Sequence, residues 1–121
     1  MSFLDAVISG IVQGVTEFLP VSSSGHLVIL HNLLGLKEPQ IGFDIFLHVG
    51  TLAAIFIVFW RDIVGIFTIK KGIGFYLLLA TLVTGIFALF FGKRIEAAFS
   101  NVKIVAVMLM ITGAWLILGG F

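Results

Sequence analysis

Two uninterrupted apolar stretches limit what this chain can fold into more than any other feature. Residues 73–92 (IGFYLLLATLVTGIFALFFG) and 104–121 (IVAVMLMITGAWLILGGF) contain no charged side chain. A helix needs about 20 apolar residues to cross a hydrocarbon core roughly 30 Å thick. Hydrophobic residues make up 60% of the chain and charged residues 11%, which leaves too little polar surface for a water-soluble domain. The sequence therefore predicts an all-α integral membrane protein.

A third apolar stretch, residues 42–60 (GFDIFLHVGTLAAIFIVFW), carries its polar groups in its first half. Asp44 fits a negative charge near the N-terminus of a helix. Trp60 fits an aromatic anchor at the membrane interface, and Arg61 follows it. We therefore expect residues 42–60, 73–92 and 104–121 to form three transmembrane helices.

Residues 3–35 fit a hairpin better than two further spans. Pro20 and the Ser/Gly stretch after it divide the segment into two arms. The second arm, residues 24–35, would be a helix of only about 18 Å, which is too short to cross. Irregular backbone at membrane depth is tolerated where protein or a water-filled cavity covers it. The sequence thus predicts one re-entrant helical hairpin over residues 3–35, followed by three transmembrane helices, in a single membrane domain of residues 1–121.

Polar side chains gather around the bend of this hairpin, in the stretch EFLPVSSSGH. Gln13 and Glu17 are four residues apart and share one face of the first arm. On the same arm, Gly10 and Gly14 allow another helix to approach closely. We expect this polar face to point into protein rather than into lipid.

The hydroxyls after the bend, those of Ser22, Ser23 and Ser24, are suited to cap the second arm. The first N–H groups and the positive dipole end of that arm form an anion site, and His26 lies in its first turn. A carboxylate, hydroxyls, an imidazole and a helix N-terminus therefore converge in one hairpin. This combination is suited to phosphate-ester chemistry.

Structural explanations compete with this interpretation. Serine runs in membrane helices commonly serve packing and hydrogen bonding, and a glutamate in a membrane can be protonated and hydrogen-bonded. Ionisable groups at that depth are nevertheless functional by default, which favours Glu17 and His26 as site residues. Helix capping or contacts within the bundle explain His31 and His48 adequately. The basic residues are expected to be solvated loop charges: Arg61, Lys70, Lys71, Lys93, Arg94 and Lys103.

Other classes of function find little support. The chain has no cysteine, so it has neither a disulfide framework nor a thiolate metal site. Its seven Lys and Arg residues are scattered, so no nucleic-acid partner is expected. Asp5 stands where a secretory signal would carry basic residues, so we expect the first segment to be retained.

Three stretches, QGVTEFLPVSSSGHL, FDIFLHVGTLAAIFIVFWRD and LLLATLVTGIFALFFG, together closely resemble the N-terminal half of the undecaprenyl-diphosphate phosphatase family of the bacitracin-resistance type. The resemblance implies a multi-pass protein of the inner cell membrane that converts undecaprenyl diphosphate to the monophosphate. It also implies one of two inverted repeats, each a re-entrant hairpin plus three spans. By the same resemblance, Glu17 matches the essential carboxylate, and Gln13 falls where members have Glu or Gln. The residues matching the catalytic serine loop and its Gly-His pattern are Ser22, Ser23, Ser24, Gly25 and His26.

The chain also departs from that family. Members are roughly twice as long, and nothing here corresponds to the Pro-Gly-x-Ser-Arg-Ser-Gly loop of their second repeat, whose arginine contacts phosphate. Val83 stands where proline is usual, which is expected to straighten that helix. A complete site then requires another chain, or the chain is a fragment or an inactive half.

The distribution of positive charge favours a second copy. With a hairpin that returns to its own side, Lys37, Lys93, Arg94 and Lys103 lie on one side of the membrane. Arg61, Lys70 and Lys71 lie on the other. This weak bias permits insertion in both orientations, and inverted repeats need opposite orientations. We therefore predict an antiparallel homodimer.

The predicted mechanism assigns a role to each polar residue. Ser23 is the nucleophile toward the terminal phosphoryl group, with Ser22 and Ser24 as alternates, and His26 is the base. Glu17, with Gln13 beside it, holds a divalent cation, Mg²⁺ or Ca²⁺, or positions a proton. The predicted substrate-binding residues are Gln13, Ser22, Ser24 and Gly25. The alternatives are a non-catalytic transporter or scaffold of lipid carriers, and an inactive half that needs an arginine-bearing partner.

Overall fold

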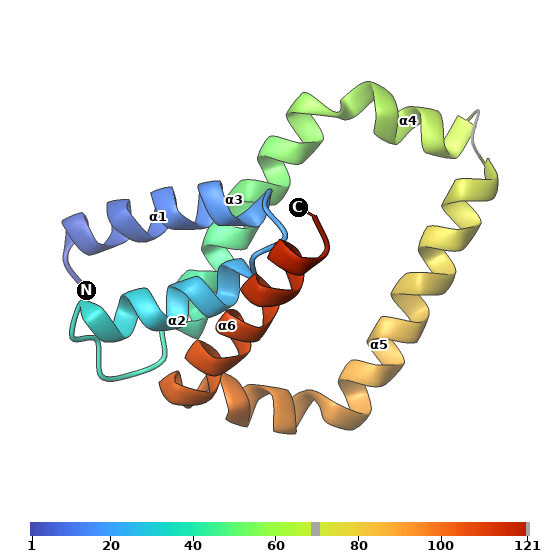
Figure 1. The fold of residues 1–121 in the computed structure, drawn as a ribbon. Coiled ribbons are helices and arrows are strands. Elements are labelled where there is room, and N and C mark those ends of the chain that lie inside the picture. Colours follow the sequence, from blue (N-terminus) through green and yellow to red (C-terminus); the bar gives the residue numbers. More distant parts are fainter. Residues whose placement is uncertain (69–70, 121) are drawn as a thin grey trace. The chain divides into compact units, whose positions relative to one another are not determined.

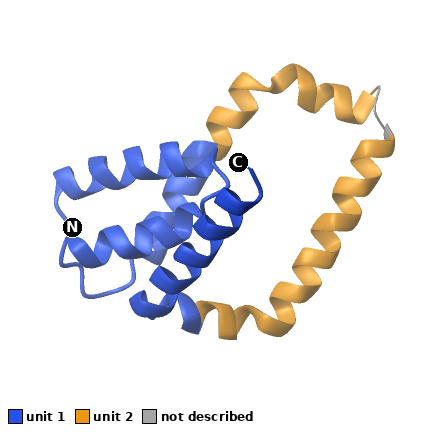
Figure 2. Ribbon diagram, viewed as in Figure 1, with its two compact units in different colours: residues 1–51, 97–121 blue, residues 52–96 orange. Residues whose placement is uncertain are grey.

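The computed structural model describes residues 1–68 and 71–120, and this part of the chain contains six helices and no strand (Figure 1). They are α1 (Phe3–Glu17), α2 (Ser23–Leu33), α3 (Ile41–Val58), α4 (Trp60–Thr68), α5 (Lys71–Phe99) and α6 (Val102–Leu118). The chain divides into two compact units, residues 1–51 with 97–121 and residues 52–96 (Figure 2). The predictions for Lys70 and Phe121 lie outside the described residues.

The two arms of the hairpin are helices α1 and α2, and local signals set their ends. Ser2 and Asp5 form a capping box at the start of α1. Helix α1 ends at Glu17, three residues before Pro20, which cannot continue a helix. After α2, Gly35 adopts φ 75°. Its N–H bonds the Asn32 carbonyl and the next N–H bonds the His31 carbonyl, a Schellman motif that ends the helix.

Three predicted spans correspond to helices, with shifted ends. Helices α3 and α5 are long and apolar enough to cross a membrane by length and composition, and α6 is a shorter apolar helix. The segment predicted as 42–60 ends at Val58, and Trp60 starts α4. The segment predicted as 73–92 belongs to a longer helix that extends to Phe99.

The prediction that the basic residues lie in loops is wrong for most of them. Arg61 lies in α4, Lys103 lies in α6, and α5 contains Lys71, Lys93 and Arg94. Lysine and arginine are good helix formers. A charge therefore marks the end of an apolar stretch without ending the hydrogen-bonded backbone.

The unit of residues 1–51 and 97–121 has a polar interior. Helix α1 packs on α2, and α2 packs on α6. The buried polar residues of the described chain are Ser9, Gln13, Thr16, Ser23 and His31, whereas its buried hydrophobic residues are Leu27 and Val105. Large apolar side chains are exposed along every helix. Polar groups inside and apolar groups outside are typical of a protein surrounded by lipid.

Of the two paired glycines of α1, one lies close to a neighbouring helix. A Cβ atom at Gly10 would lie 3.8 Å from the Leu47 side chain of α3, whereas nothing lies within 4 Å of one at Gly14. The tightest glycine of the hairpin is Gly25 in α2, where a Cβ would lie 3.1 Å from Leu109 of α6. Gly25 therefore allows α2 and α6 to pack closely.

Candidate functional site

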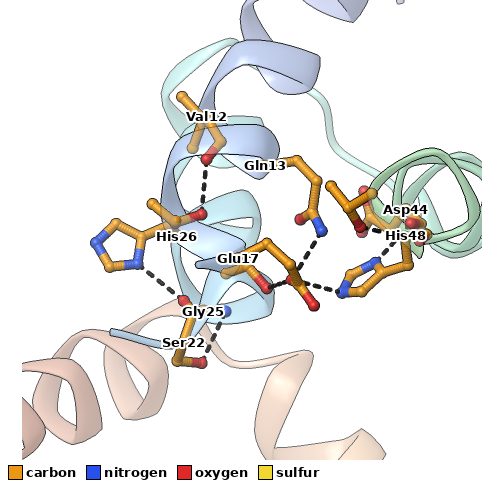
Figure 3. Close-up of polar contacts among 11 residues, drawn as sticks. Val12, Gln13, Glu17, Ser22, Gly25, His26, Asp44 and His48 are labelled. Atoms are coloured by element: carbon orange, nitrogen blue, oxygen red, sulfur yellow. Dashed lines mark hydrogen bonds and ion pairs between the residues drawn. The ribbon is translucent and has the colours of Figure 1, made fainter. Parts of the chain in front are cut away.

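Glu17, in the last turn of α1, is the centre of the polar cluster at the bend (Figure 3). Its Oε2 accepts a hydrogen bond of 2.9 Å from Gln13 Nε2 and one of 2.5 Å from the Ser23 hydroxyl. The first contact confirms that Gln13 and Glu17 share a face. The second contact joins the end of α1 to the start of α2. A carboxylate beside a serine hydroxyl can accept its proton.

Ser22 forms the bend itself and caps α2. Its backbone has φ 61° and ψ 89°, a left-handed conformation that is uncommon outside glycine. Its side chain accepts from Gly25 N at 3.3 Å, which confirms the predicted serine cap. Ser24 lies beside them in the first turn and is half-buried. Unusual backbone at a bend of this kind is often found at functional sites.

His26 lies in the first turn of α2, and its ring points away from Glu17 (Figure 3). Its Nδ1 donates to the Ser22 carbonyl at 2.8 Å. The hydrogen bond of the Ser23 hydroxyl goes to Glu17 instead. The structure therefore brings Gln13, Glu17 and Ser23 together, while His26, Ser22 and Gly25 form a neighbouring set at the start of α2.

His48 of α3 lies at the site, although helix capping or a contact within the bundle was an adequate explanation of it from the sequence. Its Nδ1 hydrogen-bonds the Asp44 carbonyl at 2.7 Å, and its Nε2 lies 3.7 Å from Glu17 Oε2. The side chains of Glu17 and His48 are 28% and 36% exposed. The signal that could have identified His48 is its chemistry, because ionisable residues within apolar spans are rare.

A second polar cluster lies deeper in the same unit. The Ser9 hydroxyl is 3.2 Å from His31 Nε2, and His31 Nδ1 is 3.8 Å from Asp44 Oδ1. Ser9 is 0% and His31 6% exposed, so both residues of this cluster are buried. Asp44 is in the first turn of α3, as predicted, and it also connects the two clusters, because its side chain faces His31 while its carbonyl binds His48.

The donor atoms around Glu17 meet only part of what a metal-ion site requires. Among the described residues, no group of three or more His, Asp and Glu side chains is placed to hold one. The side chain of Gln13 is 1% exposed, and within the described chain its Oε1 has no hydrogen-bond partner. An orphaned buried oxygen is costly, and a cation would satisfy it.

An apolar cavity of about 110 Å³ adjoins the bend. Ser22 and Gly25 contribute to its lining, and the remaining lining residues are Ala98, Phe99, Ile104, Val105, Met108, Leu109 and Thr112. The hydroxyl-rich start of α2 thus borders an apolar surface. This arrangement suits an amphiphilic ligand.

Comparisons with known proteins point to one group. The model of a family described as bacitracin resistance protein BacA matches residues 6–120. An undecaprenyl-diphosphatase from Halothermothrix orenii is 42% identical over 116 residues, covering 93% of this chain and 45% of the relative. Another from Thermosipho africanus is 40% identical over 118 residues, covering 92% and 47%. A third, from Methanosphaera stadtmanae, is 36% identical over 137 residues, covering 94% and 49%.

The chain therefore spans about half the length of the curated relatives that it matches. No solved structure matches it.

Proposed function

Since the chain belongs to the bacitracin resistance protein BacA family, we propose that it is a multi-pass phosphatase of the inner cell membrane. Its substrate is undecaprenyl diphosphate, or a related polyprenyl diphosphate, and its lipid product is the monophosphate. The observation that carries this proposal is the hydrogen bond from the Ser23 hydroxyl to Glu17, made at the N-terminus of α2.

The start of α2 is suited to bind the diphosphate. A helix leaves its first N–H groups without intrahelical partners. In α2 the Ser22 side chain takes that of Gly25, so those of Ser23 and Ser24 are left for an anion. The apolar cavity beside Ser22 would receive the first part of the prenyl chain.

Ser23 and Glu17 carry the proposed chemistry. The Ser23 Oγ attacks the terminal phosphorus, its proton passes to the Glu17 carboxylate, and the bond from phosphorus to the bridging oxygen breaks. Polyprenyl monophosphate leaves. Water then attacks the phosphoserine, inorganic phosphate is released, and Ser23 regains a proton. The contact of 2.5 Å favours Glu17 over His26 as the proton acceptor. His26 is then left to contact the phosphate.

A divalent cation fits part of this site. Glu17 and the unpartnered Oε1 of Gln13 would hold it, with water and diphosphate oxygens completing the shell, as is common for Mg²⁺. A bound cation would offset the negative charge of the phosphoryl group. The hydrogen bonds from Gln13 and Ser23 both go to Oε2 of Glu17, and a carboxylate has about four lone-pair sites on its two oxygens, so the carboxylate retains sites for a cation.

A second copy of the chain, in the opposite orientation, would complete the site. Neither hairpin unit of such a pair contains an arginine, because Arg61 and Arg94 both fall within residues 52–96, so a bound cation would supply the positive charge at the phosphate. Two hairpins that face each other at a two-fold axis would close a polar surface that one hairpin leaves open. Labelling of tags from both sides of the membrane should find both orientations. A single orientation would contradict the antiparallel homodimer.

Phosphate release by purified protein tests the phosphatase. Detergent-purified chain should release phosphate from undecaprenyl diphosphate, and Ser23→Ala should lower the rate at least about 10²-fold. Ser24→Ala is the matched comparison, since it removes a neighbouring hydroxyl, and should lower the rate far less. A protein that binds the lipid diphosphate and releases no phosphate would be a carrier or scaffold instead.

A further inference from the structure

His48 is held in an orientation that presents one nitrogen to Glu17. A carbonyl oxygen can only accept, so the 2.7 Å contact between His48 Nδ1 and the Asp44 carbonyl places the ring proton on Nδ1. The lone pair of the neutral imidazole is then on Nε2, which lies 3.7 Å from Glu17 Oε2. Metal-binding histidines are commonly fixed in this way, by donating the other ring N–H to a carbonyl or carboxylate.

The distance between the two atoms suits a shared ion better than a hydrogen bond. An N–H···O hydrogen bond spans about 2.7–3.2 Å, which is shorter than the observed 3.7 Å. Two ligand atoms that each lie about 2.1 Å from one ion are roughly 3.0–3.5 Å apart. An adjustment of a few tenths of an ångström would therefore convert Glu17 and His48 into two ligands of one ion.

We propose that His48 and Glu17 together ligate the divalent cation of this site, with the Gln13 Oε1 as a third donor. This proposal deepens the proposed function, on which it rests. The Gln13 amide supplies an independent observation, because it is 1% exposed, touches Glu17 through Nε2, and leaves its oxygen without a hydrogen-bond partner in the described chain.

The other histidines are less suited to the same role. His31 faces Ser9 through Nε2 and Asp44 through Nδ1, so both of its nitrogens are directed at other groups. His26 donates to the Ser22 carbonyl, and its ring points away from Glu17. His48 is the histidine whose ring nitrogen faces a carboxylate of the bend.

An imidazole ligand changes which ion the site should prefer. Carboxylate and amide oxygens alone suit Mg²⁺ and Ca²⁺, whereas imidazole suits zinc and other transition metals. The site should therefore bind Mn²⁺ and Zn²⁺ more tightly than Mg²⁺ or Ca²⁺. Replacement of the imidazole by an amide in His48→Gln should reduce this preference.

Pulsed electron paramagnetic resonance of bound Mn²⁺ tests the proposal directly. Purified protein in detergent, without substrate, should bind Mn²⁺ with a directly coordinated nitrogen, and the coupling should change when histidine alone is ¹⁵N-labelled. In His48→Gln the coupling should disappear, and the Mn²⁺ affinity should fall on the order of ten- to a hundredfold. His31→Gln is the matched control and should keep the coupling.

Two results would overturn the proposal: bound Mn²⁺ without a histidine nitrogen, or a coupling that persists in His48→Gln. In either case His48 is not a ligand of the ion. The wild-type labelling experiment decides the first point even if a variant fails to fold. Phosphate release is measured separately, so nitrogen coupling without phosphatase activity would refute the enzyme and leave the metal site standing.

Discussion

Helices α1 and α5 differ in where their polar side chains lie and in where they find hydrogen-bond partners. In α1 the buried residues are Ser9, Gln13 and Thr16, and two of these bond to other residues' side chains. In α5 the apolar window from Gly72 to Phe99 has none of its residues buried. The hydroxyls of Thr81 and Thr84 in α5 donate to carbonyls four residues back in their own helix. In lipid a polar group must find a partner in the protein. Helix α5 satisfies these hydroxyls within itself. In α1, Thr16 does the same by donating to the Val12 carbonyl, but the buried Ser9 hydroxyl has its partner, His31, on α2.

The largest expected effect tests whether the polar side chains inside the hairpin take part in the reaction or only stabilise the fold. Glu17→Gln keeps the size of the side chain and removes the charge that accepts the Ser23 proton. The turnover of a lipid diphosphate should fall at least about 10²-fold. Glu38→Gln, at an exposed position between α2 and α3, is the control and should not change turnover. Equal rates for wild type and Glu17→Gln would show that these polar side chains only stabilise the fold.

The next prediction compares how much a buried hydroxyl of α1 and an exposed hydroxyl of α5 contribute to the free energy of unfolding. Ser9→Ala removes the partner of buried His31 Nε2 and should lower the free energy of unfolding by about 1–2 kcal/mol. Thr81→Val removes a hydroxyl that is bonded within its own exposed helix and should change it by less than about 0.5 kcal/mol. Denaturant titration in micelles measures both. Equal losses would show that burial does not separate α1 from α5.

Alanine substitutions at two glycines of the hairpin should change the free energy of unfolding in opposite directions. In Gly25→Ala the new methyl would lie 3.1 Å from Leu109 and 3.2 Å from the Ser22 hydroxyl, so we expect a loss of about 1–3 kcal/mol from crowding. Gly14→Ala meets nothing within 4 Å and should gain about 0.5–1 kcal/mol, because alanine favours the helix. A loss at Gly14 would instead indicate that a second copy packs there.

The smallest effect depends on pH and concerns the exposed start of α1. Hydrogen bonds from the Ser2 backbone N–H and then from its side chain hold the pKa of Asp5 below its ordinary value. Its stabilisation is therefore complete above the unfolded pKa of about 3.9 and is lost as the pH falls through the lower folded value. Asp5→Asn should melt slightly below wild type at pH 7. The two melting temperatures should converge at strongly acidic pH, and a constant gap would exclude Asp5 as the cause.

Local patterns in the sequence predict much of the hairpin. The break at Pro20, the serine cap and the shared face of Gln13 and Glu17 all follow from spacings of a few residues. The residue that caps α2 could be narrowed only to three serines, because the choice of Ser22 depends on its backbone conformation.

Contacts between distant segments could not be predicted in the same way. His48 lies 31 positions beyond Glu17 and on another helix, so periodicity within one helix does not reveal their proximity. The deep Ser9–His31–Asp44 cluster was missed for the same reason. Helices α3 and α5 end at other residues than the apolar stretches 42–60 and 73–92, because hydropathy reports where apolar side chains stop, not where backbone hydrogen bonding stops.

The left-handed backbone of Ser22 also decides which sequences can substitute for this one. At φ 61°, glycine is unstrained and asparagine or aspartate is tolerated, but a β-branched residue is a genuine outlier. A library randomised at codon 22 should therefore retain serine, asparagine, aspartate and glycine among its folded members and lose valine and isoleucine. The residue type at position 22 would then report the backbone conformation of the bend. It would distinguish distant sequences that form the same bend from sequences that contain a serine run by chance.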